Sequence, residues 1–391
     1  MTDGDNRATL AVTRSLGRAG HAVVVGEKRI PSLAQTSRYC AGRWHYPDPV
    51  TQGDAFADSV AAALREHRID VLLPVADITT FEVVRHRARF EASCAVPIPS
   101  NDALDQAADK AGLLARARRL GVPTPRSLVV ERPGPPPDHD LGFPLVVKPH
   151  RSRVATAKGW KSCDVTFAND AGALAQELSR RGAHEFPIIL QERIVGPGLG
   201  VFAHYHRGRL VTLFSHRRIR ERPPWGGLSV LSESVPLDPE ARDAAVALLD
   251  DLQWHGVAMV EFKRDDRDGR AKLMEINGRF WGSLQLAIDA GVDFPQLLLQ
   301  GIESGEFAPR PPYRVGVRNR WLWGDVDSLL LTMFGGRGAP SDGASHRWRA
   351  FVEFAKFWGT DLHYENPKMG DLRPFFFETY RWFRRAAGAE A

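Results

Sequence analysis

The sequence predicts a mixed α/β (α+β) fold, in which an N-terminal, doubly wound parallel-sheet domain precedes a region of antiparallel sheets. Short apolar strands alternate with helical stretches over residues 1–108, and this rhythm is typical of parallel strand–helix–strand units. From about residue 187, apolar segments with period-two alternation follow one another closely, which indicates antiparallel strands. The 391 residues are enough for two or three domains with a substantial core.

Composition narrows the class of protein. Hydrophobic residues make up 43% of the chain and charged residues 25%, which are ordinary values for a globular protein in water. The net charge is +5, but the 43 arginines and 9 lysines are scattered without a sustained basic run, so we expect no nucleic-acid partner. No apolar run approaches the roughly 20 residues that cross a bilayer, so we expect no membrane span. The three cysteines lack zinc or disulfide spacing, which favours a cytoplasmic protein.

In the N-terminal domain we expect strands over residues 21–27 and 69–75 and a helix over residues 54–67 between them. The first six residues read as the loop that follows a strand, and a helix over residues 7–20 comes next. We therefore expect either that the first strand is reduced to a stub or that the native chain starts further upstream.

The central part of the chain begins with a helix over roughly residues 102–120, which ends at Gly121 before a proline-containing linker. An apolar strand over residues 143–149 and a polar loop over residues 150–162 follow. The loop carries Lys158 among several cations and a glycine, so it is a candidate flexible cover over phosphates. The spacings of a P-loop and of GxGxxG are both absent.

Lys148 stands at the end of that apolar strand. A lysine that emerges from a buried strand is costly to leave unpaired, so we expect a phosphate partner, with a core carboxylate as the alternative. Lys110 lies on the preceding helix and is a weaker signal by itself, because helical lysines are usually solvated.

Two later segments have polar residues at the ends of strands. Gln191, Glu192 and Ile194 come before a glycine turn, where exposed backbone groups could bind an adenine edge; the glycines could also simply shape the turn. Downstream, His216 and Arg218 alternate on one face of a basic strand. That face either binds an anionic substrate or is solvated.

The most informative segment is the pair of strands within residues 256–285, joined by a polar turn with an Asp-Gly pair. Glu275, Asn277 and Arg279 line one side of the second strand, and Glu261 lies opposite Glu275 if the turn centres on Asp-Gly. Facing carboxylates repel each other, and a divalent cation such as Mg²⁺ removes that repulsion. Arg279 would then meet a phosphate or a developing negative charge. The alternative is a surface hairpin with solvated charges.

In their order along the chain, VVKP, QERIVG and MEINGRFWGS resemble the ATP-grasp superfamily, closest to its carbamoyl-phosphate-synthase-like and carboxylate–amine ligase branch. The resemblance covers roughly residues 1–305. It implies a two-lobed ATP-grasp domain over residues 109–305, with a small lobe over 109–186 and a large lobe over 187–305. The sequence departs from the family's usual NPR, because Gly278 replaces the proline.

The resemblance also implies roles for individual residues. The expected Mg²⁺ ligands are Glu261, Glu275 and Asn277. The residues expected to bind ATP are Lys110, Lys148, Lys158, Gln191, Glu192 and Ile194. The residues expected to face the transferred phosphate and the substrate are Arg279, Arg218 and His216.

The activity that the resemblance implies is an ATP-dependent ligation. A carboxylate is activated as an acyl-phosphate and joined to an amine, with ATP and Mg²⁺ (or Mn²⁺ in its place), and ADP and phosphate are released. Two alternatives stay open: a bicarbonate-using enzyme of the carboxyphosphate or carbamoyl-phosphate type, and a non-catalytic ATP-binding regulatory protein.

Residues 306–391 differ in composition from the rest, since five of the ten tryptophans lie between Trp321 and Trp382. We expect a mainly helical, aromatic-rich extension that packs onto the body of the protein. A docking or oligomer surface, with a homodimer as the partner considered, is the functional alternative.

Overall fold

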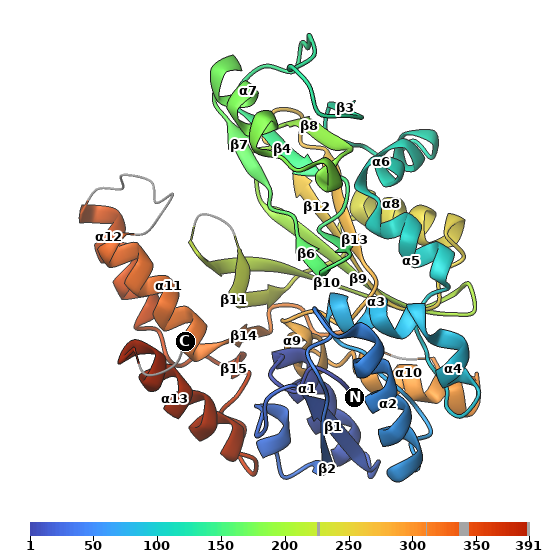
Figure 1. The fold of residues 1–391 in the computed structure, drawn as a ribbon. Helices are drawn as coiled ribbons and strands as arrows, with labels where there is room; N and C mark the ends of the chain where they lie inside the picture. Colours follow the sequence, from blue (N-terminus) through green and yellow to red (C-terminus); the bar gives the residue numbers. More distant parts are fainter. Residues whose placement is uncertain (225–226, 310, 336–343, 389–391) are drawn as a thin grey trace.

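The computed structural model describes residues 1–224, 227–309, 311–335 and 344–388. They form a mixed α/β fold, as predicted, with parallel strands in the N-terminal domain and mainly antiparallel sheets beyond it. Figure 1 shows the N-terminal domain at the bottom, a smaller sheet at the top, a larger sheet between them and the last helices at the left.

The N-terminal domain has a short parallel sheet with helices around it. β1 (Val23–Glu27) pairs in parallel with β2 (Cys40–His45), and the 3-10 turn η1 (Ala34–Thr36) lies between them in the chain. The helices are α1 (Arg7–Arg18), α2 (Gly53–Glu66), α3 (Asp77–Arg85) and α4 (Arg87–Glu91).

The first residues of the chain extend this sheet. The backbone N–H of Gly26 donates to the carbonyl of Met1 at 2.8 Å, and the N–H of Thr2 donates to the carbonyl of Leu73 at 3.3 Å. Met1 and Thr2 therefore lie between β1 and the segment before α3, where a first strand reduced to a stub would lie. The loop that follows them reaches the carboxyl ends of the strands, a usual place for ligands in such sheets.

The small lobe is a four-stranded antiparallel sheet with one helix packed on it. Its strands, in the order of the sheet, are β3 (Ser127–Val130), β8 (Ile188–Glu192), β4 (Leu145–Pro149) and β7 (Thr166–Ala168). Leu174 and Leu178 of α7 (Ala171–Arg180) pack against Leu145, Val147 and Leu190. The 3-10 turn η2 (Ala183–Glu185) leads into β8.

Two expectations for this part of the chain were wrong. The polar loop over residues 150–162 contains a β-hairpin, formed by β5 (Arg153–Thr156) and β6 (Gly159–Ser162). The single helix expected over residues 102–120 is two helices, α5 (Asn101–Ala108) and α6 (Lys110–Arg119).

The helix breaks at Asp109, whose ψ of 96° is extended and whose side chain accepts a hydrogen bond from the N–H of Ala111. Asp109 therefore caps α6. The N–H of Lys110 bonds to the carbonyl of His150 at 2.8 Å, and the Lys110 side chain is buried. The break turns Lys110 into the interior, although lysines on helices are usually solvated.

The large lobe is a seven-stranded sheet. Its strands, in the order of the sheet, are β13 (Ala271–Asn277), β12 (Gly256–Arg264), β9 (Gly198–His206), β10 (Arg209–Arg222), β11 (Leu228–Ser234), β14 (Arg318–Arg320) and β15 (Leu362–Tyr364). The accompanying helices are α8 (Pro239–Asp251), α9 (Leu284–Asp289) and α10 (Phe294–Glu303). One apolar core joins Val12 and Leu16 of α1 to Leu286 and Leu297 of this lobe, so the N-terminal domain packs directly onto the large lobe.

The C-terminal part carries α11 (Leu322–Phe334), α12 (Ala344–Phe354) and α13 (Arg373–Ala386). It also contributes β14 and β15 to the large sheet, where β14 pairs with β11. We propose to keep residues 1–108, 109–305 and 306–391 as the units of the chain, with β14 and β15 tying the last unit to the second. No helix in the described ranges is long and apolar enough to cross a membrane.

Candidate active site

Two carboxylates face each other in the β12–β13 hairpin. Glu261 is paired with Glu275 in the strand register, which confirms the pairing predicted from the sequence. The Asn277 amide donates to Oε1 of Glu261 at 3.3 Å and to Oε1 of Glu275 at 3.1 Å. Burial raises the pKa of Glu261 against the opposing charge of Arg218, and the charge of Glu275 adds to the rise. The hairpin therefore brings two carboxylates and an amide together at a place where burial and mutual repulsion disfavour negative charge.

This donor set fits a magnesium ion. Mg²⁺ takes oxygen ligands and is commonly held by one or two carboxylates together with nucleotide phosphates. Within the described ranges, no group of three or more His, Cys, Asp or Glu side chains is placed to hold a metal. A metal at this hairpin would therefore bind Glu261, Glu275 and Asn277 and complete its shell with phosphate oxygens and water.

The side chains of His216 and Arg218, on β10, lie on the same face of the large sheet as the Glu261 carboxylate. The Arg218 guanidinium donates to Oε2 of Glu261 at 2.8 Å, so it already pairs with one of the two facing carboxylates. His216 is buried, stacks on Phe202 with ring centroids 4.5 Å apart, and lies 2.8 Å from Oγ of Ser283 through Nε2. Burial, and to a lesser degree the charge of Arg218, lowers the pKa of His216 to about 3, so the imidazole is neutral at physiological pH.

Two buried lysines from different elements approach Glu275. Nζ of Lys110 lies 2.5 Å from Oγ of Ser152 and 3.8 Å from Oε2 of Glu275. Burial, with a smaller contribution from Lys110, lowers the pKa of Lys148 to about 8, and Glu275 opposes the shift. The Lys148 ammonium forms no hydrogen bond or ion pair with the part of the chain that the structure describes, so the core-carboxylate alternative is not what the structure shows. The two ammonium groups are placed to bind an anion.

Arg279 connects the hairpin to the N-terminal domain. Its guanidinium forms an ion pair with Asp77, the first residue of α3, through two hydrogen bonds, and it also donates to the carbonyl of Phe280 at 2.9 Å. Gly278 beside it is tightly enclosed, since a Cβ there would lie 2.4 Å from Leu104 and 3.0 Å from the Trp254 ring. Close packing therefore explains the glycine at the position where the family usually has proline.

The hinge between the lobes is built from β8 and the residues after it. The Gln191 side chain donates to Oγ of Ser127 at 2.9 Å, and Ile194 is buried with its carbonyl accepting from Lys263 at 3.4 Å. Glu192 is buried and accepts from the N–H of Arg126 at 2.8 Å.

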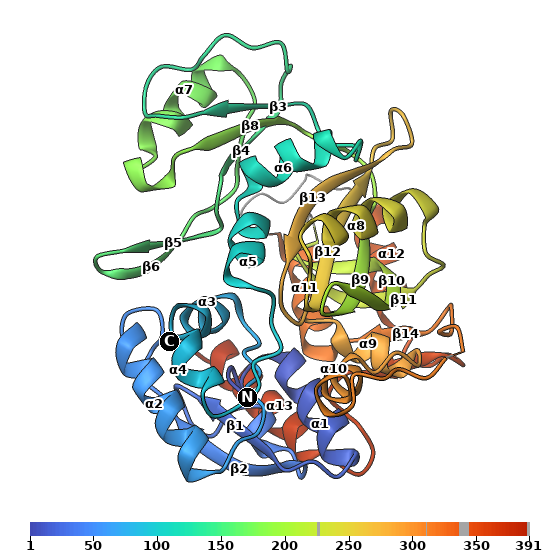
Figure 2. The same ribbon diagram turned by 90° about the vertical axis from the view of Figure 1, so that its right-hand side faces the viewer.

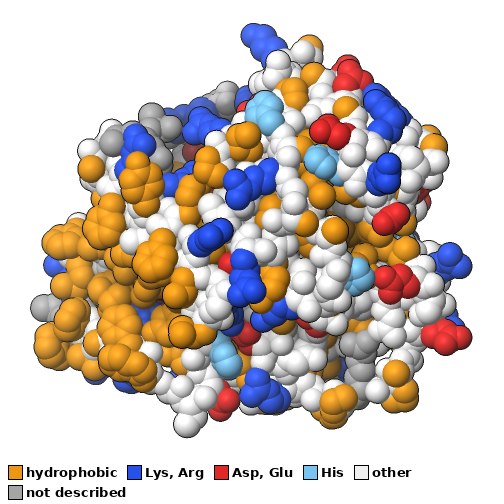
Figure 3. Space-filling view, turned by 90° about the horizontal axis from the view of Figure 1, so that it is seen from below, with side chains coloured by type: hydrophobic (Ala, Val, Ile, Leu, Met, Phe, Trp, Pro, Cys, Tyr) orange, Lys and Arg blue, Asp and Glu red, His pale blue; other side chains and the backbone are white. Residues whose placement is uncertain are grey.

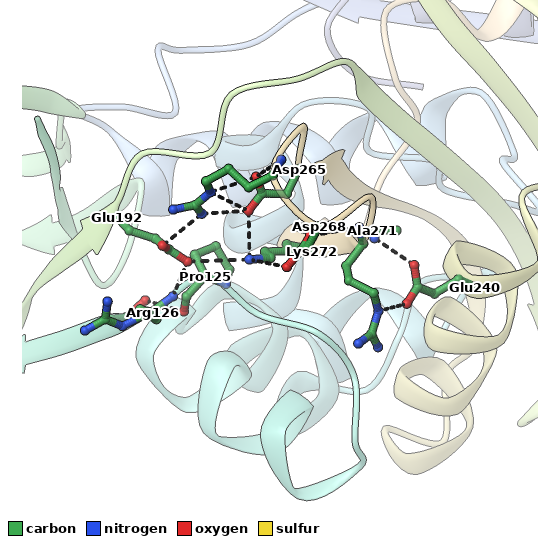
Figure 4. A network of polar contacts seen from close by, with 11 residues as sticks. Pro125, Arg126, Glu192, Glu240, Asp265, Asp268, Ala271 and Lys272 are labelled. Carbon is green, nitrogen blue, oxygen red and sulfur yellow. Dashed lines mark hydrogen bonds and ion pairs between the residues drawn. The ribbon is translucent and has the colours of Figure 1, made fainter. Parts of the chain in front are cut away.

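A charge network fixes Glu192 to the turn of the β12–β13 hairpin (Figure 4). Arg267 bridges Glu192 at 2.9 Å and Asp265 at 2.6 Å, and Lys272 approaches Asp265 at 2.7 Å. Hydrogen bonds from Arg267 hold the pKa of Asp265 well below its usual range. The Glu192 carboxylate is therefore engaged in holding the hinge against the turn of the β12–β13 hairpin, and it is not free to contact a ligand.

The β5–β6 hairpin reaches across to the N-terminal domain (Figure 2). The Trp160 indole donates to Glu82 at 2.5 Å and stacks on Phe81 with centroids 5.3 Å apart. Gly159 has a φ of +104°, and a Cβ there would lie 2.1 Å from the carbonyl of Val50. Lys158, at the tip of the hairpin, is exposed and does not line either of the cavities described next.

Two cavities meet at the Asp77–Arg279 ion pair. The first, of about 60 Å³, is lined by this pair and by Lys110, Glu275 and Asn277. The second, of about 420 Å³, shares the same pair.

The larger cavity lies between the start of α1 and the C-terminal helices. Its wall includes Arg7, Trp321, Phe377, Arg381 and Arg385. The Arg7 guanidinium lies 4.0 Å from the centroid of the Trp321 ring and 2.6 Å from Glu365. Sequence reasoning missed this wall and Asp77, because no local pattern relates residues at the two ends of the chain. The only signal was the concentration of aromatic residues after residue 306.

Comparisons with known proteins agree with this geometry. Residues 185–324 match the family model described as "ATP-grasp in the biosynthetic pathway with Ter operon". A search of curated protein sequences finds no significant match.

Three solved structures share the fold over most of the chain. The L-amino acid ligase from Bacillus licheniformis has a TM-score of 0.59 at 17% identity and covers 78% of this chain and 74% of its own. A biotin carboxylase–ATP-analogue complex from Campylobacter jejuni has a TM-score of 0.60 at 14% identity, with 80% and 72% covered. The biotin carboxylase domain of Hydrogenobacter thermophilus 2-oxoglutarate carboxylase, solved with MgADP and bicarbonate, has a TM-score of 0.60 at 16% identity, with 80% and 71% covered. The chain therefore has the fold of ATP-grasp enzymes, and residues 185–324 within it match an ATP-grasp family model.

Proposed function

We propose that the protein is an ATP- and Mg²⁺-dependent ligase that activates a carboxylate as an acyl-phosphate and joins it to an amine, releasing ADP and phosphate. The observation that supports this most is the position of the Asp77–Arg279 pair, which borders both cavities. The smaller cavity carries lysine and carboxylate groups suited to phosphates and a cation. The larger cavity is of a size that takes a small organic molecule. A carboxylate bound there would meet the transferred phosphoryl group at Arg279.

The proposed roles follow from the contacts. Glu261, Glu275 and Asn277 would hold Mg²⁺, or Mn²⁺ in its place, and the ion supplies charge neutralisation at the phosphates. Lys110 and Lys148 would bind phosphate oxygens, since both are buried cations without a full complement of partners. The strand segment with Gln191, Glu192 and Ile194 would carry the adenine, with apolar neighbours around the ring.

Charge develops on the phosphoryl group as the carboxylate attacks it. Arg279 would stabilise that charge, while Asp77 keeps the guanidinium oriented before substrate binds. Arg218 now pairs with Glu261. If the Glu261 carboxylate held the metal, the Arg218 guanidinium would be free to bind an oxygen of the substrate or of a phosphate. His216, being neutral and bonded to Ser283, would act as a positioning residue beneath this strand. Lys158 would travel with the β5–β6 hairpin, whose closure excludes water from the labile acyl-phosphate.

A bicarbonate-using enzyme is the second candidate, because the fold is shared with biotin carboxylases, one of them solved with bicarbonate. The larger cavity favours the ligase. Its aromatic and apolar wall, which includes Leu228, Trp321 and Phe377, has no role with an ion as small and polar as bicarbonate. A non-catalytic ATP-binding protein could bind MgATP through the same facing carboxylates, but it would have no use for the second cavity that Arg279 borders. A cytoplasmic location is part of the proposal, because the reaction uses ATP.

The test is an ADP-release screen with pools of amino acids and small acids, with and without amine and with bicarbonate alone. We expect release that needs both a carboxylate and an amine. Glu275→Gln should abolish it, while Glu240→Gln, an exchange on α8 outside both cavities, should leave it unchanged. Release driven by bicarbonate alone would support the second candidate. MgATP binding without release across all pools would support the non-catalytic protein.

A further inference from the structure

The last three helices leave a large apolar surface exposed to solvent. We define the aromatic face by the exposed apolar side chains of α11, α12 and α13, which are Leu330, Phe334, Trp348, Phe351, Val352, Phe376, Tyr380 and Phe383. Figure 3 shows apolar side chains gathered on the side of the molecule that these helices form. Contiguous apolar surface of this kind marks a site of interaction with a protein or a membrane.

The pattern on α13 shows that the helix is built with two apolar sides. Phe376, Tyr380 and Phe383, spaced four and three residues apart, share one side and are 62%, 58% and 57% exposed. The other side packs on the body, where Pro374 is buried and Phe377 contacts the core shared by α1 and the large lobe. Packing of α13 onto the protein therefore accounts for only one of its two apolar sides.

The neighbouring helices α11 and α12 continue the aromatic face, and stacked rings hold their side chains in place. The Trp323 ring of α11 stacks on the Trp382 ring of α13 at 4.5 Å, which holds these two helices together. On α12, the Trp348 and Phe351 rings stack on each other at 5.8 Å while both remain exposed. Phe334 at the end of α11 is 82% exposed. Such rings are presented in fixed positions and lose little conformational freedom when something binds.

The charges around the aromatic face are positive. Arg347 and Arg349 of α12 and Arg373 of α13 are exposed and form no ion pair with residues in the described ranges. The described carboxylates between residues 325 and 378 are all engaged by ion pairs or hydrogen bonds, and they are Asp325, Asp327, Glu353, Asp361, Glu365, Asp371 and Glu378. These carboxylates thus have partners within the fold, whereas the three arginines have no ion-pair partner among the described residues.

We propose that the aromatic face binds the surface of an anionic lipid bilayer. Aromatic rings with apolar bodies suit the boundary between headgroups and acyl chains, and the arginines suit the lipid phosphates. The protein would lie on the bilayer, because no helix in the described part of the chain is long and apolar enough to cross it. A second copy of the chain fits this surface less well. A symmetric dimer on the same face would bring the unpaired arginines of both copies together without carboxylates to offset them.

Flotation of the full-length protein with vesicles tests the proposal. We expect it to float with vesicles of phosphatidylcholine and phosphatidylglycerol, and much less with phosphatidylcholine alone or at high salt. The triple change Phe376→Ser, Tyr380→Ser and Phe383→Ser should abolish flotation. Arg347→Gln with Arg349→Gln should lower the affinity by roughly 25-fold, since each arginine near an anionic surface contributes about fivefold.

The matched control is Phe167→Ser, which changes a phenylalanine of the small lobe that is 57% exposed and lies outside the aromatic face. It should float like the unchanged protein, and all variants should keep its thermal unfolding temperature. Absence of flotation, or flotation of the triple variant at full affinity, would overturn the proposal. A dimer in light scattering that the triple variant dissociates, without vesicle binding, would assign the aromatic face to self-association.

Discussion

Lys148 is charged and buried in the fold, and burying this charge lowers the free energy of unfolding. Replacing the lysine by an uncharged side chain should therefore stabilise the protein. Burial, with a smaller contribution from Lys110, lowers its pKa from 10.5 to about 8. That difference corresponds to roughly 3 kcal/mol in the free energy of unfolding, because one pKa unit is worth about 1.4 kcal/mol. Lys148→Met keeps a long unbranched side chain without the charge. At neutral pH it should therefore raise the free energy of unfolding by up to about 3 kcal/mol.

The effect has a defined dependence on pH. Below about pH 8 the ammonium is charged in the folded and the unfolded chain, so the full cost is present. Between that pH and 10.5 the folded protein binds fewer protons than the unfolded chain, so the stability of the unchanged protein rises with pH. The gap between Lys148→Met and the unchanged protein should therefore close over this range.

Urea unfolding followed by tryptophan fluorescence at several pH values measures the gap, and calorimetric titration with MgADP measures the function. Nucleotide affinity should fall by roughly 10- to 100-fold, as expected for the loss of a charge-assisted bond to phosphate. Lys161→Met, which removes an exposed lysine of β6, should change neither quantity appreciably. A destabilised Lys148→Met variant, or a gap that does not vary with pH, would refute the reasoning about burial. Unchanged nucleotide affinity would refute the phosphate role.

Three further predictions concern the surroundings of the site. Gly278→Ala should lower the free energy of unfolding, measured by chemical denaturation, by about 1–3 kcal/mol, because the new Cβ would overlap the packed core. Gly198→Ala should leave it unchanged, because the space around that Cβ position is open. Trp160→Ala removes the hydrogen bond to Glu82, so the β5–β6 hairpin should detach from the N-terminal domain. Limited proteolysis should then be faster and the KM for ATP several-fold higher than in the unchanged protein. Proteolysis at the unchanged protein's rate would contradict the docked hairpin. Asp77→Asn should slow ADP release by about tenfold or more at saturating ATP, because Arg279 loses the charged partner that orients its guanidinium. An unchanged rate would rule out a positioning role for Asp77.

The register of the β12–β13 hairpin could be predicted because its information is local. Strand alternation and an Asp-Gly turn fix which side chains share a face and which residues lie opposite each other. Glu261 and Glu275 are therefore paired as expected. The apolar strand predicted over residues 143–149 was recognised for the same reason, since its side chains run continuously between glycine and proline signals, and it is found as β4.

The break at Asp109 could not be predicted from periodicity. Apolar spacing continues through residues 102–120, and the decisive interactions are a cap at Asp109 and a bond from Lys110 to His150 in another element. The hairpin within residues 150–162 was missed for a similar reason: it is polar and docks on the N-terminal domain through Trp160. Tertiary contacts decide both cases.

The larger cavity is the part of the site most remote from sequence patterns. Asp77 and Arg279 are 202 residues apart, and the opposite wall comes from α1 and α13 at the two ends of the chain. Aspartate at the start of a helix is common for capping and dipole reasons alone, so Asp77 gave no sign of its partner. Only the folded arrangement brings an arginine of the hairpin to the mouth of a second cavity.

The central claim is that a carboxylate attacks the γ-phosphate of ATP beside Arg279. Once the ADP-release screen has identified a carboxylate, the most direct measurement is to supply that acid with ¹⁸O in its carboxyl group and analyse the released phosphate by mass spectrometry. Passage through an acyl-phosphate transfers one labelled oxygen from the acid to phosphate, and the account predicts this transfer in each turnover. Phosphate that carries no label while product forms would contradict it.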